Sequence, residues 1–222
     1  MQRTLLVVMI SALAFSPATS SGARLSSFDR FVDRWNRLHD YSVTIEAHES
    51  LGQESADNEM LYRFRKPDRA RLDVMAGPKA GSTIVWRGGQ RVTAYKRSLS
   101  LFKMHGDAHQ KDLTSLRGNG ILAPNMGLLA TCFGAHRDVL VERPGPVVDG
   151  DPTTEVELPY KGITCPEDPA VDRGAITLDV LDVSDRTGLV LVRKRYAGDE
   201  IVERWQLKDY KLDAGLGDGD LR

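Results

Sequence analysis

Apolar residues recur at helical spacing near the beginning of the chain, and polar residues take the positions between them. Such a stripe predicts an amphipathic helix whose apolar face packs against another element. Ser26, followed three positions later by Asp29, resembles a capping box, in which side chains satisfy free backbone N–H groups. The apolar positions of this predicted helix are Phe28, Phe31, Val32, Trp35 and Leu38.

From Tyr41 onward the period changes to two, which is typical of strands with one buried face. The alternating runs are joined by short links, one of which contains the turn pair Gly88-Gly89. Short links favour antiparallel pairing of consecutive strands. The predicted strands include residues 41–47, 60–64, 70–74, 83–86 and 92–96, a continuation through Leu99, Leu101 and Lys103, and then 139–142, 154–158, 176–180, 189–196 and 201–212.

Residues 112–136 interrupt this alternation between the two groups of strands. Many of them are Leu, Ile, Met or Phe, and Gly118-Asn119-Gly120 and Pro124 break the run. The pattern indicates one or two short helices with a hinge between them. We expect this mid-chain insert to cover part of the sheet.

The first residues have the pattern of a signal peptide. Arg3 precedes the apolar run 5–15, and small residues follow it up to Ala23. Because such a run is shorter than the ~20 apolar residues that span a bilayer, export and cleavage are predicted. We therefore expect a signal peptide at 1–23, a single domain at 24–213 and a disordered, glycine-containing tail at 214–222, with the mature protein in the periplasm or another extracytoplasmic space.

Charge and motifs exclude several functions. The formal net charge is −1 for all 222 residues, which provides no basic surface of the kind that binds nucleic acid. The sequence contains neither a G-x-S-x-G elbow nor a phosphate-binding loop, so we expect no enzyme activity and no cofactor. His105 and His109 are spaced four apart, but a zinc site needs further ligands that the sequence does not supply. No metal is therefore predicted.

Cys132 and Cys165 are the two cysteines of the chain. In an exported protein such a pair predicts one disulfide. Two reduced, buried thiols are the alternative, because the sequence does not show that the positions meet.

Two stretches resemble the LolA/LppX/RseB-like superfamily of periplasmic lipoprotein carriers, including its DUF1571-like branch. The first is YRFRKPDRARL (62–72) followed by VWRGGQRVTAY (85–95), similar to a strand, a basic turn with proline, a strand and a glycine hairpin. The second is DVSDRTGL (182–189) followed by RKRY (193–196), ERW (203–205) and DYKL (209–212), similar to the C-terminal hairpin and last strand of that superfamily.

The resemblance implies an α+β fold, in which a curved, incompletely closed antiparallel sheet, or half-barrel, has its concave face covered by an N-terminal helix and mid-chain helices. It implies a monomeric carrier, related to outer membrane lipoprotein sorting, that holds a lipid or an acylated lipoprotein and meets a docking protein of the inner or outer membrane. In carriers of the LolA type an arginine before the proline hydrogen-bonds the lid, whereas this chain has Lys66 there, which keeps the charge but loses the planar fork. We take Lys66 as the candidate lid contact, and the candidate residues of the lipid cavity and lid are Phe31, Trp35, Tyr62, Phe64, Leu72, Trp86, Leu122, Met126, Leu129 and Phe133.

Three alternatives stay open at this stage. The candidate cavity residues also suit an ordinary core, because pockets and cores use the same residue types. An RseB-like sensor or regulatory binding module would use the same fold to contact a signalling partner. A hydrolase of unrecognised type that depends on His105 or His109 is the third alternative.

Overall fold

The computed structural model of the chain describes residues 26–99, 102–160, 162–163, 165 and 176–222. The predicted signal peptide at 1–23 lies outside these residues. Within the described part, no helix is both long and apolar enough to cross a bilayer.

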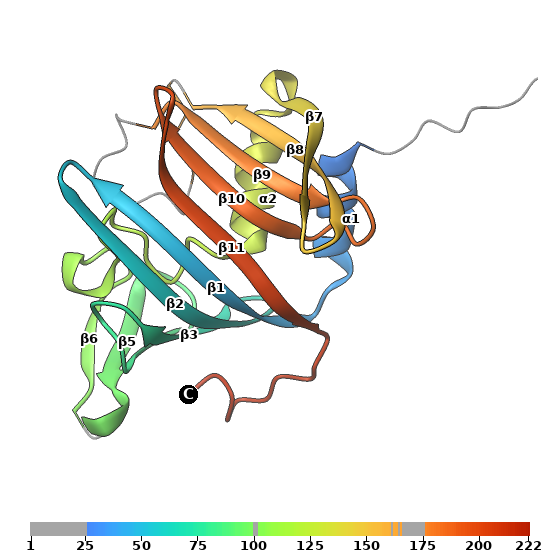
Figure 1. Cartoon of the computed structure of the whole chain (residues 1–222). Coiled ribbons are helices and arrows are strands. Elements are labelled where there is room, and N and C mark those ends of the chain that lie inside the picture. The colour runs from blue at the N-terminus through green and yellow to red at the C-terminus, as the bar shows by residue number, and fades with distance from the viewer. Residues whose placement is uncertain (1–25, 100–101, 161, 164, 166–175) are drawn as a thin grey trace, which may run out of the picture.

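One antiparallel sheet of 11 strands forms the body of the structure, in the order β6-β5-β4-β3-β2-β1-β11-β10-β9-β8-β7 (Figure 1). Its first and last strands in this order do not pair, so the predicted open, curved sheet with helices is confirmed. The strands are β1 (Asp40–Leu51), β2 (Glu54–Arg65), β3 (Arg69–Ala76), β4 (Ser82–Trp86), β5 (Arg91–Lys96), β6 (Met104–Asp107), β7 (Val141–Val148), β8 (Asp151–Pro159), β9 (Leu178–Ser184), β10 (Val190–Ala197) and β11 (Glu200–Leu212).

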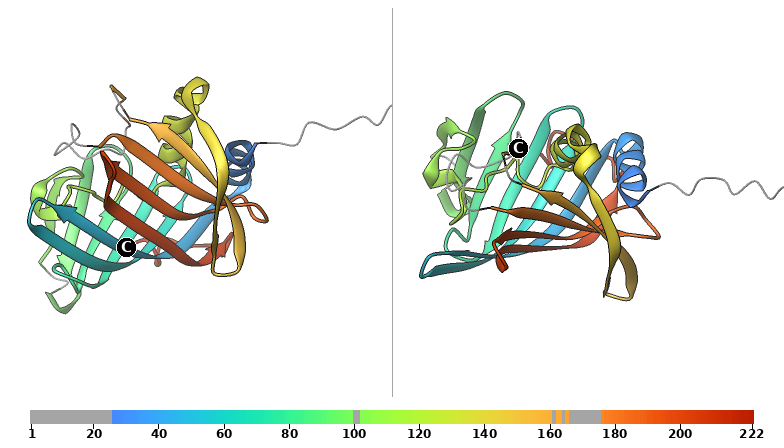
Figure 2. Two further views of the ribbon diagram at one scale, coloured as in Figure 1. Left: turned by 45° about the horizontal axis from the view of Figure 1, so that its top comes forward. Right: turned by 90° about the horizontal axis from the view of Figure 1, so that it is seen from above.

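The two α-helices lie on the inner side of the bent sheet, as the view from above shows (Figure 2). The Ser26 side chain caps the first of them by accepting a hydrogen bond from the Asp29 N–H at 3.0 Å, as the sequence pattern predicts. The ring centroids of Phe28 and Phe133 are 6.3 Å apart, which joins the two helices. The helices are α1 (Ser27–Arg37) and α2 (Met126–Ala135), and single 3-10 turns form η1 (Arg97–Leu99), η2 (Lys111–Leu113) and η3 (Arg137–Val139).

The register of the strands decides which side chains face the helices. Tyr41, Val43, Ile45, Ala47 and Glu49 of β1 point to the concave face, because alternate residues of a strand share a side. Tyr41 confirms this direction, since its hydroxyl donates to the Pro124 oxygen of the mid-chain insert at 3.0 Å. The hydrophobic core lies on this face, between the sheet, the insert and the helices.

The structure differs from the sequence prediction at two links between strands. Residues 97–99 form η1 instead of continuing a strand, and β6 begins only at Met104; Leu101 lies outside the described residues. Pro144-Gly145-Pro146 does not end its strand, because β7 passes through it with a register shift between Pro144 and Val147. Both prolines are tolerated because β7 is an edge strand, where one side needs no ladder hydrogen bonds.

Several residues of the C-terminal segment 214–222 form hydrogen bonds with the sheet, and the disorder expected of this segment stays a prediction. The Asp40 carboxylate accepts hydrogen bonds from the backbone N–H groups of Ala214, Gly215 and Leu216. Further along, the Arg222 backbone oxygen accepts from Tyr95 Oη at 3.0 Å. Capture of free backbone groups by side chains of the sheet is a tertiary effect that composition does not reveal.

Candidate functional site

The ten candidate cavity residues come together beneath α1 and α2, where they pack against one another. Seven of them are buried and three are partly buried, all in one hydrophobic cluster. Trp35 of α1, for example, lies with its ring centroid 5.6 Å from that of Phe64 on β2. In this arrangement they form core between helices and sheet, and their contact with cargo stays a prediction. The buried residues are Phe31, Tyr62, Phe64, Leu72, Met126, Leu129 and Phe133, and the partly buried ones are Trp35, Trp86 and Leu122.

Lys66, the candidate lid contact, lies at the C-terminal end of α1. Its Nζ donates to the backbone oxygens of Trp35 at 2.6 Å and Asn36 at 3.3 Å. The same ammonium group is 4.2 Å from the centre of the Trp35 ring. A cation at this end of a helix satisfies free carbonyl groups and interacts favourably with the helix dipole. Lys66 therefore secures α1 to the β2–β3 turn.

Cys132 of α2 and Cys165 form a disulfide with their Cα atoms 5.2 Å apart. The bond ties α2 to the segment that follows β8. The prediction of a disulfide from the cysteine pair is thus supported, and the reduced alternative does not apply to this structure.

A buried polar network anchors the mid-chain insert to the concave face. Glu49 of β1 and Glu203 of β11 are register partners, and the Asn119 Nδ2 group donates to both carboxylates, at 2.9 and 2.6 Å. Ser115 Oγ and the Arg117 N–H also donate to Glu49. Burial raises the pKa of Glu203; the charge of Arg195 opposes this rise, and the charge of Glu49 adds to it. Because buried carboxylates need hydrogen-bond donors, this network holds the insert in one place.

Next to this network, two arginines share one buried carboxylate. Arg193 Nη2 and Arg195 Nε of β10 donate to the same oxygen of Asp179 on β9, at 2.6 and 3.1 Å. Burial alone would raise the pKa of Asp179, but the charges of the two guanidinium groups outweigh it and lower the pKa. Arg193 also donates to the Ala123 backbone oxygen at 3.3 Å, so this cluster holds the middle of the insert.

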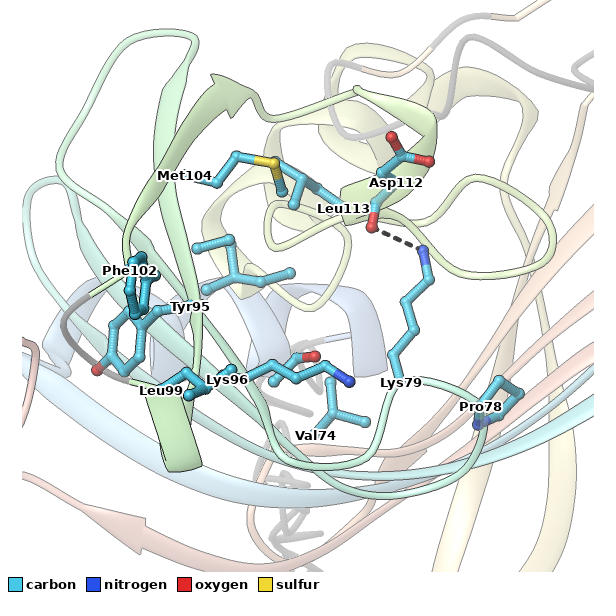
Figure 3. A pocket seen from close by; sticks show the side chains of 13 residues that line it. Val74, Pro78, Lys79, Tyr95, Lys96, Leu99, Phe102, Met104, Asp112 and Leu113 are labelled. Carbon is cyan, nitrogen blue, oxygen red and sulfur yellow. Dashed lines mark hydrogen bonds between the residues drawn. The ribbon is translucent and has the colours of Figure 1, made fainter.

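An apolar pocket opens on the part of the concave face that strands β3 to β6 form (Figure 3). The inward residues Val74 of β3, Ile84 of β4 and Ala94 of β5 form its floor, and Leu113 of η2 lies across from them. The pocket has a volume of about 420 Å³, within the range of ~300–1,000 Å³ that small-molecule sites occupy. Its complete lining is Val74, Pro78, Lys79, Ser82, Ile84, Ala94, Tyr95, Lys96, Leu99, Phe102, Met104, Asp112 and Leu113.

Lys79 closes one side of this pocket by binding the start of the insert. Gly77, with φ of 105°, begins the β3–β4 turn that carries Lys79, and this conformation favours glycine. The Lys79 Nζ donates to the backbone oxygens of Lys111, Asp112 and Thr114 at 3.3, 2.9 and 2.6 Å. Figure 3 shows the hydrogen bond to Asp112. Burial lowers the pKa of Lys79, although the charge of Asp112 opposes this shift. Lys79 thus contacts the start of the insert, whereas Lys66 contacts α1, and the lid role of Lys66 stays a prediction.

A second pocket, of about 650 Å³, lies on the other side of Lys79. The two pockets have Pro78, Lys79 and Asp112 in common. The Lys79 side chain and the segment that it binds therefore separate two hollows. Leu51, Ser55 and Leu116 are among the residues that line the second one.

His105 and His109 lie on β6 and in the turn that follows it. His105 lies on β6, not on a helix, and its Nδ1 is 3.1 Å from Thr93 Oγ1. Among the residues that the structure describes, no group of three or more His, Cys, Asp or Glu side chains could hold a metal ion. The apolar pocket is suited to binding an apolar molecule.

Sequence reasoning missed the residues of the pocket. Lys79 lies in the link between β3 and β4, within the stretch GPKAGS at 77–82. Alternation does place Val74, Ile84 and Ala94 on one face of their strands. No sequence signal, however, shows that the insert leaves this part of the face open.

Comparison with known proteins finds similarity at the level of structure. No protein-family model matches the chain, and no curated protein matches it. An outer membrane lipoprotein-sorting protein domain from Vibrio parahaemolyticus is 12% identical, with a TM-score of 0.42, covering 88% of this chain and 95% of its own. Lipoprotein LppX from Mycobacterium tuberculosis is 14% identical, with a TM-score of 0.44, covering 86% of this chain and 95% of its own.

A third similar structure is the MucA/MucB complex of Pseudomonas aeruginosa. Its matching chain is 17% identical, with a TM-score of 0.44, and the match covers 87% of this chain and 60% of that one. Membership of the superfamily that the sequence resembles, and of its DUF1571-like branch, stays a prediction. Because identities and TM-scores are low, no residue role is transferred from them.

Proposed function

We propose that this chain is an exported carrier that holds a lipid, or an acyl chain of a lipoprotein, in the apolar pocket between β3–β6 and η2. The cargo binds without covalent chemistry and leaves unchanged. The single observation that carries this proposal is the pocket of about 420 Å³, whose floor consists of Val74, Ile84 and Ala94.

The energetics of the pocket suit reversible binding of hydrocarbon. Each buried methylene contributes about 0.8 kcal/mol, so a chain of about ten carbons would supply roughly 8 kcal/mol before the cost of immobilising it. The net affinity then falls in a range that allows both loading and release. A continuous apolar floor with few polar groups selects for hydrocarbon and against sugars or peptides.

Export is part of the same proposal. It is supported by the signal-peptide pattern of the leading segment and by the disulfide between Cys132 and Cys165, since disulfides persist in oxidising compartments. In such a compartment a lipid has to cross an aqueous space, and an apolar pocket would shield it from water during the crossing.

The test is lipid analysis of protein that has been purified without detergent. Native mass spectrometry should show a bound lipid, and a fluorescent fatty acid should bind to delipidated protein. Met104→Trp should reduce this binding about tenfold or more by occupying the pocket, since Met104 is half exposed and tolerates a larger side chain. Val147→Trp, at an exposed position of β7, is the matched control and should bind normally.

Two results would count against the carrier. An empty wild-type protein that also fails to bind the fatty acid would rule out the pocket as a lipid site. Recovery of a membrane-bound regulatory protein, with no lipid, would favour the sensor module instead.

A further inference from the structure

Exposed apolar side chains gather around the mouth of the lipid pocket. Phe102 is 76% exposed, Leu99 55%, Met104 46% and Met75 45%. The first three line the pocket, and Met75 lies beside η1, where its sulfur is 3.6 Å from Arg97 Nη2. Large apolar side chains that are exposed together mark an interaction surface, whereas single ones do not.

Cations accompany these side chains. The segment from Lys96 to Met104 contains Lys96, Arg97 and Lys103 and no acidic residue, in a chain whose net charge is −1. Asp112 is the one carboxylate among the residues that line the pocket. We name this surface the basic apolar rim, and it consists of Met75, Lys96, Arg97, Leu99, Phe102, Lys103 and Met104.

We propose that the basic apolar rim docks on an anionic phospholipid membrane, so that cargo passes between the bilayer and the pocket without crossing water. The proposal rests on the proposed carrier function. Aromatic and aliphatic side chains enter the boundary between headgroups and acyl chains, while lysine and arginine keep their charges at the phosphates. Neither the insertion of apolar side chains nor the attraction of cations to phosphates holds a protein firmly on a membrane by itself, but the two together do.

The position of the rim in the fold supports a membrane as the partner. Except for Met75 on β3, the rim lies on β5, η1, β6 and the link before β6, at the end of the sheet farthest from β7 (Figure 1). Because Leu99, Phe102 and Met104 belong both to the rim and to the pocket lining, a membrane bound to the rim would face the pocket mouth directly. A lipid could then move from one apolar environment into the other.

The experiment measures flotation of the mature, disulfide-bonded protein with vesicles. Wild-type protein should bind phosphatidylcholine vesicles that contain phosphatidylglycerol, and should bind pure phosphatidylcholine vesicles at least tenfold more weakly. Added salt should weaken the binding, because it screens the attraction. The double variant R97Q/K103Q should bind the anionic vesicles about tenfold more weakly, since each cation near the surface contributes to attachment.

Matched controls separate docking from other effects. R143Q/R186Q removes the same net charge at largely exposed positions distant from the rim, and Val147→Ser removes an exposed apolar group from β7. Both controls should leave vesicle binding unchanged, whereas Phe102→Ser should weaken it. Arg97 and Lys103 do not line the pocket, so R97Q/K103Q should still bind the fluorescent fatty acid in the absence of vesicles.

The outcomes are distinguishable. Normal fatty-acid binding without any vesicle binding would overturn the docking surface and leave the carrier intact. Equal losses in R97Q/K103Q and R143Q/R186Q would overturn it too, because net charge alone would then explain the attraction. Vesicle binding by a protein that binds no fatty acid would reject the carrier function, and with it the transfer of cargo that docking serves.

Discussion

The ammonium group of Lys66 donates to the backbone oxygen of Trp35 at 2.6 Å and lies 4.2 Å from the centre of the Trp35 ring. The same Trp35 ring packs so closely on Gly127 of α2 that a Cβ atom on the glycine would be 2.4 Å from Trp35 Cζ2. The Trp35 indole ring thus connects three elements, namely the β2–β3 turn, α1 and α2. These two contacts help to hold α2 over the sheet, together with the Cys132–Cys165 disulfide.

Lys66→Met should destabilise the protein by about 1 kcal/mol, because it removes a cation from the end of a helix and from the face of an indole. Lys66→Arg keeps the charge and should retain most of the stability. Urea unfolding of both variants measures the difference. Equal stability of the methionine variant and the wild type would show that the contact contributes nothing.

Gly127→Ala should destabilise the fold by about 1–3 kcal/mol, because the Trp35 ring would have to move to admit the methyl group. The matched control is Gly134→Ala in the same helix, where the added Cβ would meet Phe28 only at an ordinary distance of 3.8 Å. That substitution should stabilise the protein by about 0.5–1 kcal/mol through helix propensity. Thermal unfolding should therefore give shifts of opposite sign, and shifts of the same sign would contradict the close packing.

Lys79→Met should loosen the start of the insert, because three backbone oxygens between residues 111 and 114 lose their donor. Amide hydrogen exchange in η2 and the following residues should become faster, while exchange in the central strands β1 and β11 stays slow. Lys211→Met, at an exposed position of β11, is the control. Unchanged exchange in η2 would show that other contacts hold the insert.

Replacing both Cys132 and Cys165 by serine should lower the free energy of unfolding by about 3–4 kcal/mol on the chain-entropy model, since the bond joins residues 33 positions apart. Chemical denaturation of the double variant, compared with the oxidised wild type, measures this loss. The reduced wild type should behave like the variant. A loss below roughly 1 kcal/mol would indicate that the unfolded chain gains little freedom.

The free energy of unfolding should depend on pH through the ionisation of the buried Glu203. Burial raises the pKa of this carboxyl above its ordinary value of 4.5, so the folded state binds its proton more tightly than the unfolded state does. Ionisation of Glu203 therefore costs stability as the pH rises from about 4.5 through the higher pKa of the folded protein. Glu203→Gln cannot ionise, so its stability relative to the wild type should increase over this window in urea titrations.

The stability contributed by Asp179 should depend on pH in the opposite direction, in the same urea titrations. Its pKa is lowered below 3.8, so it contributes stability that is present above this value and is lost as the pH falls through the folded pKa. Asp179→Asn should thus be most destabilised, relative to the wild type, near neutral pH. Parallel pH curves for the Glu203 and Asp179 variants would contradict both assignments.

Local patterns were sufficient for most of the secondary structure. The apolar stripe of α1 with its Ser26 cap, and the alternation around Val43 and Ile45, depend on neighbours along the chain, so the sequence reveals them. The prediction departed from the structure where tertiary contacts outweigh local preference. An example is β7, whose edge position tolerates Pro144-Gly145-Pro146.

The sequence by itself determined an N-terminal helix, an antiparallel sheet and an apolar insert, because these depend on composition and periodicity, whereas export stays a prediction. Only the tertiary structure decided which apolar residues form core and which line a pocket. The predicted cavity residues, such as Phe31 and Phe133, pack between the helices and the sheet, whereas Ile84 and Ala94 of the same cluster also line the open hollow. Both sets are equally hydrophobic, so the difference comes from where Lys79, Asn119 and Arg193 hold the insert.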